Sequence, residues 1–106
     1  MRESKFQANF KQELLERFPG SIVTKLDSSN FQGIPDLLFL YQDKWATFEM
    51  KRSANAKRQP NQEYYVDKMN GMSFSRFVCP ENKEEVLDEL QQAFKPGRAT
   101  RVSRRK

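Results

Sequence analysis

The chain has 106 residues and a formal net charge of +5, with 37% hydrophobic and 31% charged residues. This length predicts one domain with a modest hydrophobic core, and the composition argues against wholesale disorder. Histidine is absent and Cys79 is the single cysteine, which excludes an internal disulfide and the usual zinc and catalytic-histidine sites. Any metal must therefore be a hard cation that oxygen atoms bind. No apolar run reaches bilayer length and the amino-terminal residues lack a signal-peptide core, so we expect a cytoplasmic protein.

The positive charge is concentrated at the carboxyl end. Residues 95–106 include six basic residues and no acid, whereas residues 1–94 hold 13 basic and 14 acidic residues. We expect residues 1–94 to form the domain and residues 95–106 to be a flexible tail that binds a polyanion, because each neutralised phosphate releases counterions. A solubilising tail is the alternative. The candidate DNA-binding residues of this tail are Arg98, Arg101, Arg104 and Arg105.

The first half of the chain predicts a helix followed by three strands. Apolar residues recur every four positions over residues 4–18, which is typical of an amphipathic helix, and Pro19 and Gly20 end it. Residues 21–26 are β-branched and alternate as in a strand. After a loop, residues 36–41 and 45–50 form a hairpin with a turn over residues 42–44. The first hairpin strand is continuously apolar, which predicts a central strand covered on both faces.

The second half predicts a loop, a helix, a strand and a last helix. Residues 51–61 are a polar, basic loop, and a helix begins at Pro60 and Asn61 and runs to about Met69, where Asn70 and Gly71 stop it. Residues 73–79 form a strand, and residues 80–94 form a helix with Pro80 and acids in its first turn. The predicted fold class is α/β, in the order α-β-β-β-α-β-α, with a mixed sheet flanked by helices.

Three charged residues lie within or beside the apolar hairpin. Alternate side chains of a strand share a face, so Glu49 and Lys51 are neighbours, and the hairpin turn returns them to the end of the first strand, where Asp36 lies. Two carboxylates this close repel unless a cation separates them. Mg²⁺ suits such a site, because it binds one or two carboxylates together with water and substrate phosphate oxygens. Lys51 could then orient or deprotonate the attacking water or offset charge on the phosphate.

This arrangement resembles the active site of the PD-(D/E)XK nuclease superfamily: Pro35-Asp36, a hairpin, then Glu49-Met50-Lys51. The predicted order of elements is also that family's core. Within the superfamily, "GIPDLLFL", "FEMKRS" and "PNQEYYVDKMNG" resemble the small VRR-NUC domains, some of which occur alone in phages and which are related in fold to Holliday junction resolvases. The resemblance covers roughly residues 3–90. It implies that Asp36 and Glu49 bind metal, that Lys51 is catalytic and that Gln62 supports the site.

The same family usually adds an acid from the first helix. At about 100° per residue, Glu3 points along the apolar stripe, Glu13 lies at its edge and Glu16 well outside it, so we favour Glu3 over Glu13 as a third metal ligand. Gln62 shares a helix face with Tyr65 and Met69, and could hydrogen-bond a ligating carboxylate or metal-bound water. An ordinary residue at a helix start is the alternative for Gln62.

The basic loop and the aromatic residues are further candidates. Arg52, Lys57 and Arg58 follow Lys51 closely and could hold the phosphodiester backbone, with a solvated loop as the alternative. Tyr64 and Tyr65 could stack on bases, but we expect Tyr65 in the core and Tyr64 merely exposed. Phe31 and Trp45 are expected to pack.

The residues together predict a Mg²⁺-dependent DNA endonuclease in which Mn²⁺ can replace Mg²⁺. Since no side chain is suited to reading bases by itself, we expect recognition of DNA shape, with branched DNA such as a Holliday junction first. Symmetric cutting of two strands would require a homodimer. The alternatives are a non-catalytic nucleic-acid-binding protein that uses the basic loop and tail, and an interaction module that blocks another protein. Replacement of Asp36 by asparagine separates an enzyme from a pure binder, because only the enzyme would lose metal-dependent cleavage.

Overall fold

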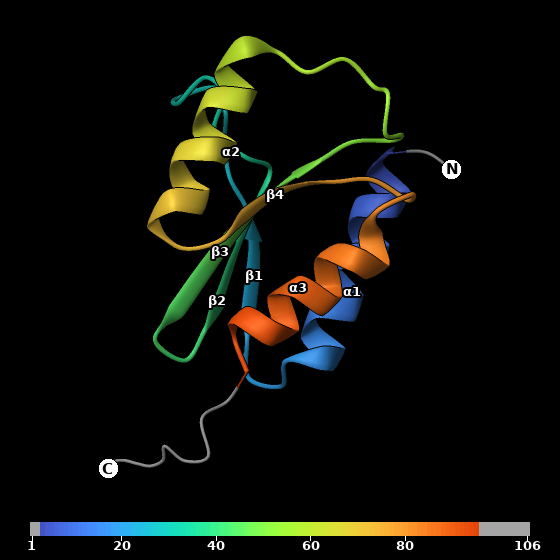
Figure 1. Ribbon diagram of the computed structural model, residues 1–106, viewed down its shortest axis with the longest axis vertical. Coiled ribbons are helices and arrows are strands. Elements are labelled where there is room, and N and C mark those ends of the chain that lie inside the picture. The colour runs from blue at the N-terminus through green and yellow to red at the C-terminus, as the bar shows by residue number, and fades with distance from the viewer. Residues whose placement is uncertain (1–2, 96–106) are drawn as a thin grey trace.

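The computed structural model describes residues 3–95, so the predicted tail arginines Arg98, Arg101, Arg104 and Arg105 lie outside the described residues. Its elements follow the predicted order α-β-β-β-α-β-α, which is thereby confirmed (Figure 1). No helix within residues 3–95 combines the length and the apolar character that crossing a membrane requires. The elements are α1 (Glu3–Arg17), β1 (Ile22–Lys25), β2 (Leu37–Tyr41), β3 (Lys44–Met50), α2 (Pro60–Met72), β4 (Ser75–Val78) and α3 (Lys83–Ala93).

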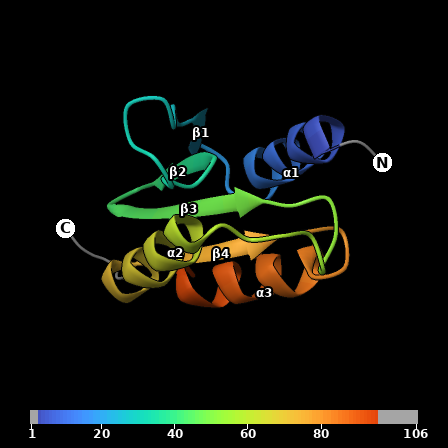
Figure 2. The ribbon, with the colours of Figure 1, turned by 90° about the horizontal axis from the view of Figure 1, so that it is seen from above.

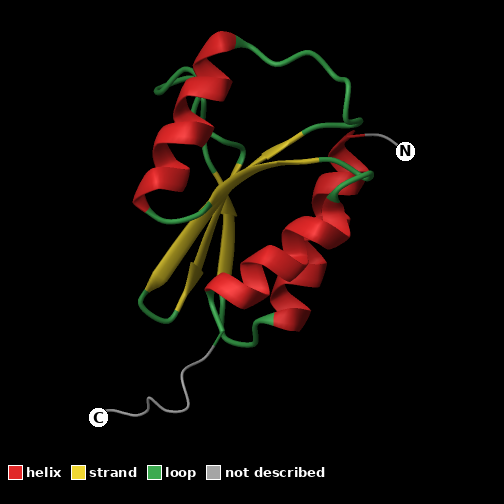
Figure 3. Cartoon of the chain, in the orientation of Figure 1, coloured by secondary structure: helices red, strands yellow, loops and turns green. Residues whose placement is uncertain are grey.

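A mixed four-stranded sheet in the order β1-β2-β3-β4 forms the middle of the molecule. The first three strands are antiparallel neighbours, and β4 runs parallel to β3. Helix α2 covers one face of the sheet, while α1 and α3 lie on the other face (Figures 1 and 2). The long loop between β3 and α2 crosses from the end of the sheet to the start of α2 (Figure 3). This confirms the predicted mixed sheet flanked by helices.

The two faces of β3 have different environments, as the alternation of its residues predicts. Phe48 is fully buried and meets Phe10 of α1 edge-to-face at 5.1 Å between ring centroids. On the opposite face, the Thr47 hydroxyl donates to Ser75 Oγ at 2.8 Å. The core lies on the side of α1 and α3, and its largest fully buried side chains are Phe10, Leu14, Leu37, Phe39, Phe48, Met50, Val78, Leu87 and Leu90. The polar residues of β3 therefore face α2.

Two predicted helix boundaries are wrong. Helix α2 continues through Asn70 and Gly71 to Met72, and the Ser73 N–H still donates to the Met69 carbonyl at 2.9 Å. The Asn70 side chain instead accepts a hydrogen bond from the Ser75 N–H at 3.1 Å, which links the helix to β4. A tertiary contact of this kind overrides the local tendency of Asn and Gly to end a helix.

Helix α3 begins at Lys83 rather than at Pro80. The Asn82 side chain accepts from the Cys79 N–H at 2.8 Å and donates to the Phe77 carbonyl at 2.9 Å. These two hydrogen bonds hold the residues after β4 in a turn, so the helix starts only after Asn82.

Strand β2 is central, as predicted, but its outer half is covered on one face only. Leu38 is half-buried and Leu40 is 38% exposed, whereas Phe39 between them is fully buried. Helix α2 packs over β3 and β4 and leaves this part of β2 uncovered. The prediction that both faces are covered is therefore wrong at Leu40.

Candidate active site

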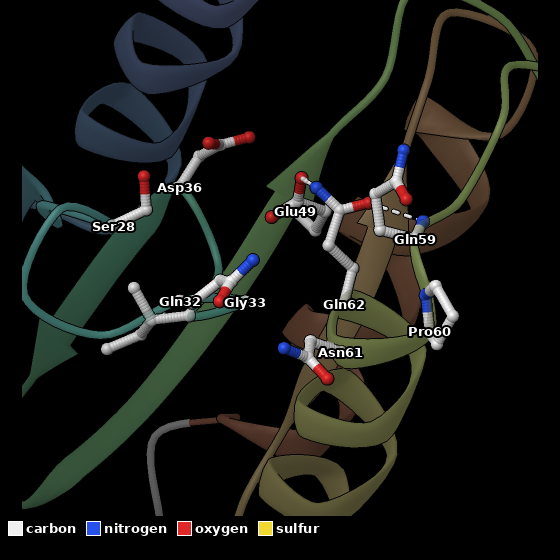
Figure 4. Close-up of a pocket in the computed structure, with 10 residues that line it drawn as sticks. Ser28, Gln32, Gly33, Asp36, Glu49, Gln59, Pro60, Asn61 and Gln62 are labelled. Atoms are coloured by element: carbon white, nitrogen blue, oxygen red, sulfur yellow. Dashed lines mark hydrogen bonds between the residues drawn. The ribbon is translucent and has the colours of Figure 1, made fainter.

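One pocket of about 380 Å³ contains both predicted metal-binding carboxylates. It opens where β2 begins and β3 ends, and the loop before β2 and the first turn of α2 form its walls (Figure 4). The figure shows Glu49 between Asp36 on one side and the α2 residues on the other. The lining residues are Ser28, Gln32, Gly33, Ile34, Asp36, Glu49, Gln59, Pro60, Asn61 and Gln62.

Strand register explains why the two carboxylates share this pocket. Leu37 pairs with Phe48 in the antiparallel β2–β3 ladder, so one step further along the ladder Asp36 lies opposite Glu49. Directly opposed residues of antiparallel strands point to the same face of the sheet, with Cβ atoms typically about 5 Å apart. Asp36 and Glu49 therefore lie on one face, that of α2.

Asp36 is half-buried and held by the backbone of the neighbouring strand. Its Oδ2 atom accepts a hydrogen bond from the Met50 N–H at 2.8 Å. Burial raises the pKa of Asp36, while the Met50 hydrogen bond and the positive charges of Lys51 and Lys25 act in the opposite direction. Because burial has the larger effect, the ionised Asp36 carboxylate lacks enough compensating positive charge within the protein.

Glu49, Gln62 and Lys51 form a hydrogen-bonded network at the other side of the pocket. Glu49 is 4% exposed, and its Oε2 atom accepts from Gln62 Nε2 at 2.8 Å. Lys51 Nζ donates to Gln62 Oε1 at 2.9 Å and lies 3.9 Å from Glu49 Oε2. The predicted proximity of Glu49 and Lys51 is present, and Gln62 connects the two.

The orientation of the Gln62 amide follows from its partners. Its Oε1 atom accepts from the Lys51 ammonium and from the Gln59 N–H at 3.0 Å. Since both of these groups can only donate, Nε2 must point toward the Glu49 carboxylate, as it does in Figure 4. The first turn of α2 thus fixes the position of an amide that restrains Glu49.

The donor set suits a hard divalent cation. Carboxylate oxygens from Asp36 and Glu49 line a polar pocket, and such oxygens are what Mg²⁺ prefers. Among the side chains that the structure describes, no three acidic, histidine or cysteine residues come together as a metal-binding group. With two protein carboxylates, a Mg²⁺ ion would take its other ligands from water and from substrate phosphate.

Glu3 and Glu13 are the two candidates for the acidic metal ligand expected from the first helix. The side chain of Glu3 lies outside the described part of the structure, so its role as a third metal ligand stays a prediction. Its alternative, Glu13, forms ion pairs with Lys83 of α3 and, at 3.5 Å, with Arg17. Glu13 does not line the pocket, and these pairs give it a structural role between α1 and α3.

The basic residues of the loop after β3 are not equivalent. Arg52 is exposed, and the carbonyl of Lys57 accepts a hydrogen bond from Lys51 Nζ at 3.0 Å. The Arg58 guanidinium lies 3.9 Å from the centroid of the Phe77 ring and lines another hollow beside β4. Lys57 therefore lies next to the candidate site, whereas the Arg58 side chain faces away from the pocket of Asp36 and Glu49.

Sequence reasoning missed several residues of the site. Lys25 acts on the Asp36 carboxylate because β1 ends beside the start of β2, a neighbour relation that strand order could have indicated. Gln59 and Asn61 line the pocket because α2 begins there. Gly33 lines the pocket because the loop before β2, to which it belongs, contacts α2 at Asn61. No local sequence pattern indicates this contact.

Gly33 allows the loop before β2 to lie against α2. Its φ is +91°, and a Cβ atom built there would lie 2.6 Å from Asn61 Cβ. We expect Gly33→Ala to lower the free energy of unfolding by about 1–2 kcal/mol through its backbone conformation and by about 1–3 kcal/mol more through overpacking. Thermal denaturation with Gly20→Ala as the matched control tests this, since Gly20 has φ +88° and open space around it. Equal losses in the two variants would show that the Asn61 contact contributes nothing.

Comparisons with known proteins agree with this fold. No protein-family model and no curated protein matches the sequence. A solved structure titled "VRR_NUC domain" has a TM-score of 0.57 and 24% identity, covering 76% of this chain and 92% of that chain. Another, titled "VRR_NUC domain protein", has a TM-score of 0.64 and 13% identity, covering 90% of this chain and 89% of that chain. The chain thus has the fold of these VRR_NUC domain proteins over most of its length.

Proposed function

We propose that this protein is a metal-dependent nuclease that hydrolyses DNA phosphodiester bonds at the pocket of Asp36 and Glu49. The observation that carries the proposal is the pairing of these two carboxylates on one sheet face, next to a lysine that shares a glutamine with one of them. If Glu49 and Lys51 formed only a structural ion pair, the pocket would not need Asp36, a second carboxylate whose pKa burial raises despite nearby positive charges. The VRR_NUC fold supports the same activity.

Each residue has a distinct role in the proposed reaction. Asp36 and Glu49 would hold Mg²⁺ or Mn²⁺, and Glu3 is the candidate third ligand. The bound cation would polarise the phosphate and make water a stronger nucleophile. Gln62 positions the Glu49 carboxylate through its hydrogen bond. Lys51 would orient the water, accept its proton or offset the negative charge that develops on the phosphate as the phosphorus–oxygen bond breaks.

We further propose that the substrate is branched DNA, with a four-way junction as the first candidate. The polar side chains that line the pocket in the described part of the chain are amides, a hydroxyl and carboxylates, which suit a phosphate and a cation better than a base sequence. Lys57 and Arg52, together with the arginines beyond residue 95, would hold the phosphate backbone next to the pocket, and Arg58 would contact DNA only outside the pocket, at the hollow beside β4. Paired cuts across a junction would come from a homodimer, whose two-fold axis supplies two sites.

A cleavage assay on matched substrates tests this function. End-labelled linear, nicked, flap and four-way DNA of shared sequence would be incubated with Mg²⁺, with Mn²⁺ or with EDTA. We expect cleavage with either metal and none with EDTA, and the branched substrates should be cut at least about tenfold faster than linear duplex, or about 1.4 kcal/mol in the barrier. Absence of metal-dependent cleavage on every substrate would contradict the proposal and favour a non-catalytic DNA-binding protein.

A further inference from the structure

Three aromatic residues lie together outside the hydrophobic core. The rings of Phe31 and Tyr65 meet edge-to-face at 4.8 Å between centroids, and those of Tyr65 and Tyr64 at 4.9 Å. Tyr64 is 57% exposed and Phe31 is 41% exposed, and none of the three belongs to the core cluster. The expectation that Tyr65 is in the core is therefore wrong, whereas Phe31 packs as expected, against Tyr65, and stays partly exposed. These side chains therefore contribute little to the core. Large aromatic rings usually contribute most when they are buried, so their position outside the core needs another explanation.

This aromatic group lies between the same loop and the same helix that line the candidate active site. The pocket is lined by the loop before β2 and by the start of α2, which touch at Gly33 and Asn61 (Figure 4). Phe31 and Tyr65 join the same loop to the same helix, and Tyr65 lies four residues, about one helical turn or 5.4 Å, beyond Asn61. The Phe31–Tyr65 pair therefore lies about one turn along α2 from Asn61, which lines the pocket, and Tyr64 extends the group over the exposed side of the helix.

One basic side chain lies beside the Tyr64 ring. Lys68 Nζ lies 6.0 Å from the centroid of the Tyr64 ring, on the following turn of α2. The acidic residues of this helix, Glu63 and Asp67, line a different hollow, which also contains Arg58 and Arg76. Lys68 could therefore contact the phosphate of a nucleotide whose base stacks on Tyr64.

We propose that Tyr64 and Phe31, supported by Tyr65, form a stacking platform for an unpaired nucleotide of the DNA substrate. The inference rests on the proposed nuclease function and specifies its substrate: DNA with unpaired bases next to the bond that is cut. A base inside a duplex has both faces covered by its neighbours, so it cannot stack on an exposed ring, whereas a base at a branch or a flap can. Stacking is tolerant of base identity, which agrees with the lack of a base-reading residue in the pocket.

Fluorescence and affinity measurements test the platform without relying on cleavage. The probe is a duplex with a short single-stranded tail that carries 2-aminopurine, and a blunt duplex of the same sequence is its control. All proteins carry Asp36→Asn so that the DNA stays intact. We expect the parent protein to quench the 2-aminopurine, and Tyr64→Ala to relieve the quenching and weaken binding of the tailed DNA by about five- to hundredfold. Binding of blunt DNA should be unchanged.

Two matched variants separate stacking from general effects. Tyr64→Phe keeps the ring and should retain quenching and affinity. Ile22→Ala removes another exposed apolar side chain, 58% exposed on β1, and should leave both readouts unchanged. Phe31→Ala should act in the same direction as Tyr64→Ala, and circular dichroism confirms that each variant is folded.

Several results would overturn the platform. It is wrong if Tyr64→Ala and Phe31→Ala both bind and quench the tailed DNA like their parent. It is also wrong if they weaken tailed and blunt DNA equally, or if they change only self-association, which would mark a protein-binding surface. If any of these three results occurs while the native protein still cleaves DNA, the nuclease function stands without the platform. If quenching depends on Tyr64 but the native protein cleaves nothing, the platform stands and the nuclease function fails.

Discussion

Asp36→Asn is expected to reduce Mg²⁺-dependent cleavage by roughly a thousandfold or more while DNA binding is retained or improved. Asparagine keeps the size of the side chain and can still accept the Met50 N–H hydrogen bond, so the local geometry should persist. What is lost is a negative charge next to Glu49, and with it the affinity for a divalent cation. Cleavage rates and DNA affinity, measured on the same substrate, distinguish a catalytic role from a binding role.

The same substitution should stabilise the metal-free protein at neutral pH. Burial raises the pKa of Asp36 in the folded state, so the ionised carboxylate is less favourable there than in the unfolded chain. The contribution of Asp36 to stability is fully present below its unfolded pKa and is lost as the pH rises through the folded pKa. The asparagine side chain does not titrate, and we expect Asp36→Asn to melt at a higher temperature than the native protein at pH 7.

Thermal denaturation as a function of pH and metal checks this sign. The difference in melting temperature between Asp36→Asn and the native protein should shrink as the pH falls toward the usual pKa of an aspartate. Mg²⁺ or Mn²⁺ should raise the melting temperature of the native protein and have little effect on Asp36→Asn, because binding to the folded state alone stabilises it.

Asp43→Asn is the matched control for both measurements. It makes the same chemical change at the other end of the hairpin, where the Asp43 side chain is 88% exposed. It should leave cleavage and metal stabilisation unchanged. The metal-binding role of Asp36 would be rejected if Asp36→Asn cleaved like Asp43→Asn or if metal stabilised the two variants equally.

Lys51→Met is expected to lower the cleavage rate by about 10²–10⁴-fold with less effect on DNA affinity. Lys51 Nζ is held by Gln62 Oε1 and by the Lys57 carbonyl, beside the buried Glu49. Methionine fills similar volume but removes the charge and the proton donor. It also removes a positive charge close to Glu49, so we expect the metal-free protein to lose about 1–3 kcal/mol of stability. Single-turnover kinetics and thermal denaturation give the two quantities separately.

Lys51→Arg distinguishes between the two possible chemical roles of Lys51, and Lys44→Met is the matched control. Arginine keeps the positive charge but cannot accept a proton from water, so substantial activity in Lys51→Arg would indicate electrostatic stabilisation rather than proton transfer. Lys44→Met removes a lysine from the other end of β3, where it pairs with Asp43, and should cleave normally. If Lys51→Met cleaved as fast as Lys44→Met, Lys51 would have no part in the chemistry.

Much of the fold was predictable because its signals are local. The four-residue spacing of apolar side chains in α1 and the alternation along β3 describe how each element meets the core, and both hold in the structure. The boundaries of α2 and α3 were less predictable. There, Asn70 and Asn82 bond to residues of β4 and its turn, and these contacts override the local tendencies of Asn, Gly and Pro.

In the candidate site too, some features follow from the local sequence and others depend on contacts between elements. The opposition of Asp36 and Glu49 follows from a hairpin with a short turn, so it could be derived from the sequence. The turn leaves Gln42 at φ 58°, and the Tyr41–Lys44 pairing sets the register that brings the two carboxylates to one face. The inward direction of Gln62 also followed from helical periodicity. Its hydrogen bond with Lys51 did not, because Lys51 follows β3 and belongs to a different part of the fold.

The sequence alone determined the order of the elements, the buried face of β3 and the pairing of two carboxylates with a lysine. Short periods in the chain encode these features directly. Only the tertiary structure decided that Gln62 restrains Glu49, that Arg58 stacks on Phe77 and that Phe31, Tyr65 and Tyr64 lie together. Each of these depends on how α2 and its neighbouring loops pack against the sheet, and packing between segments distant in the chain leaves no local pattern.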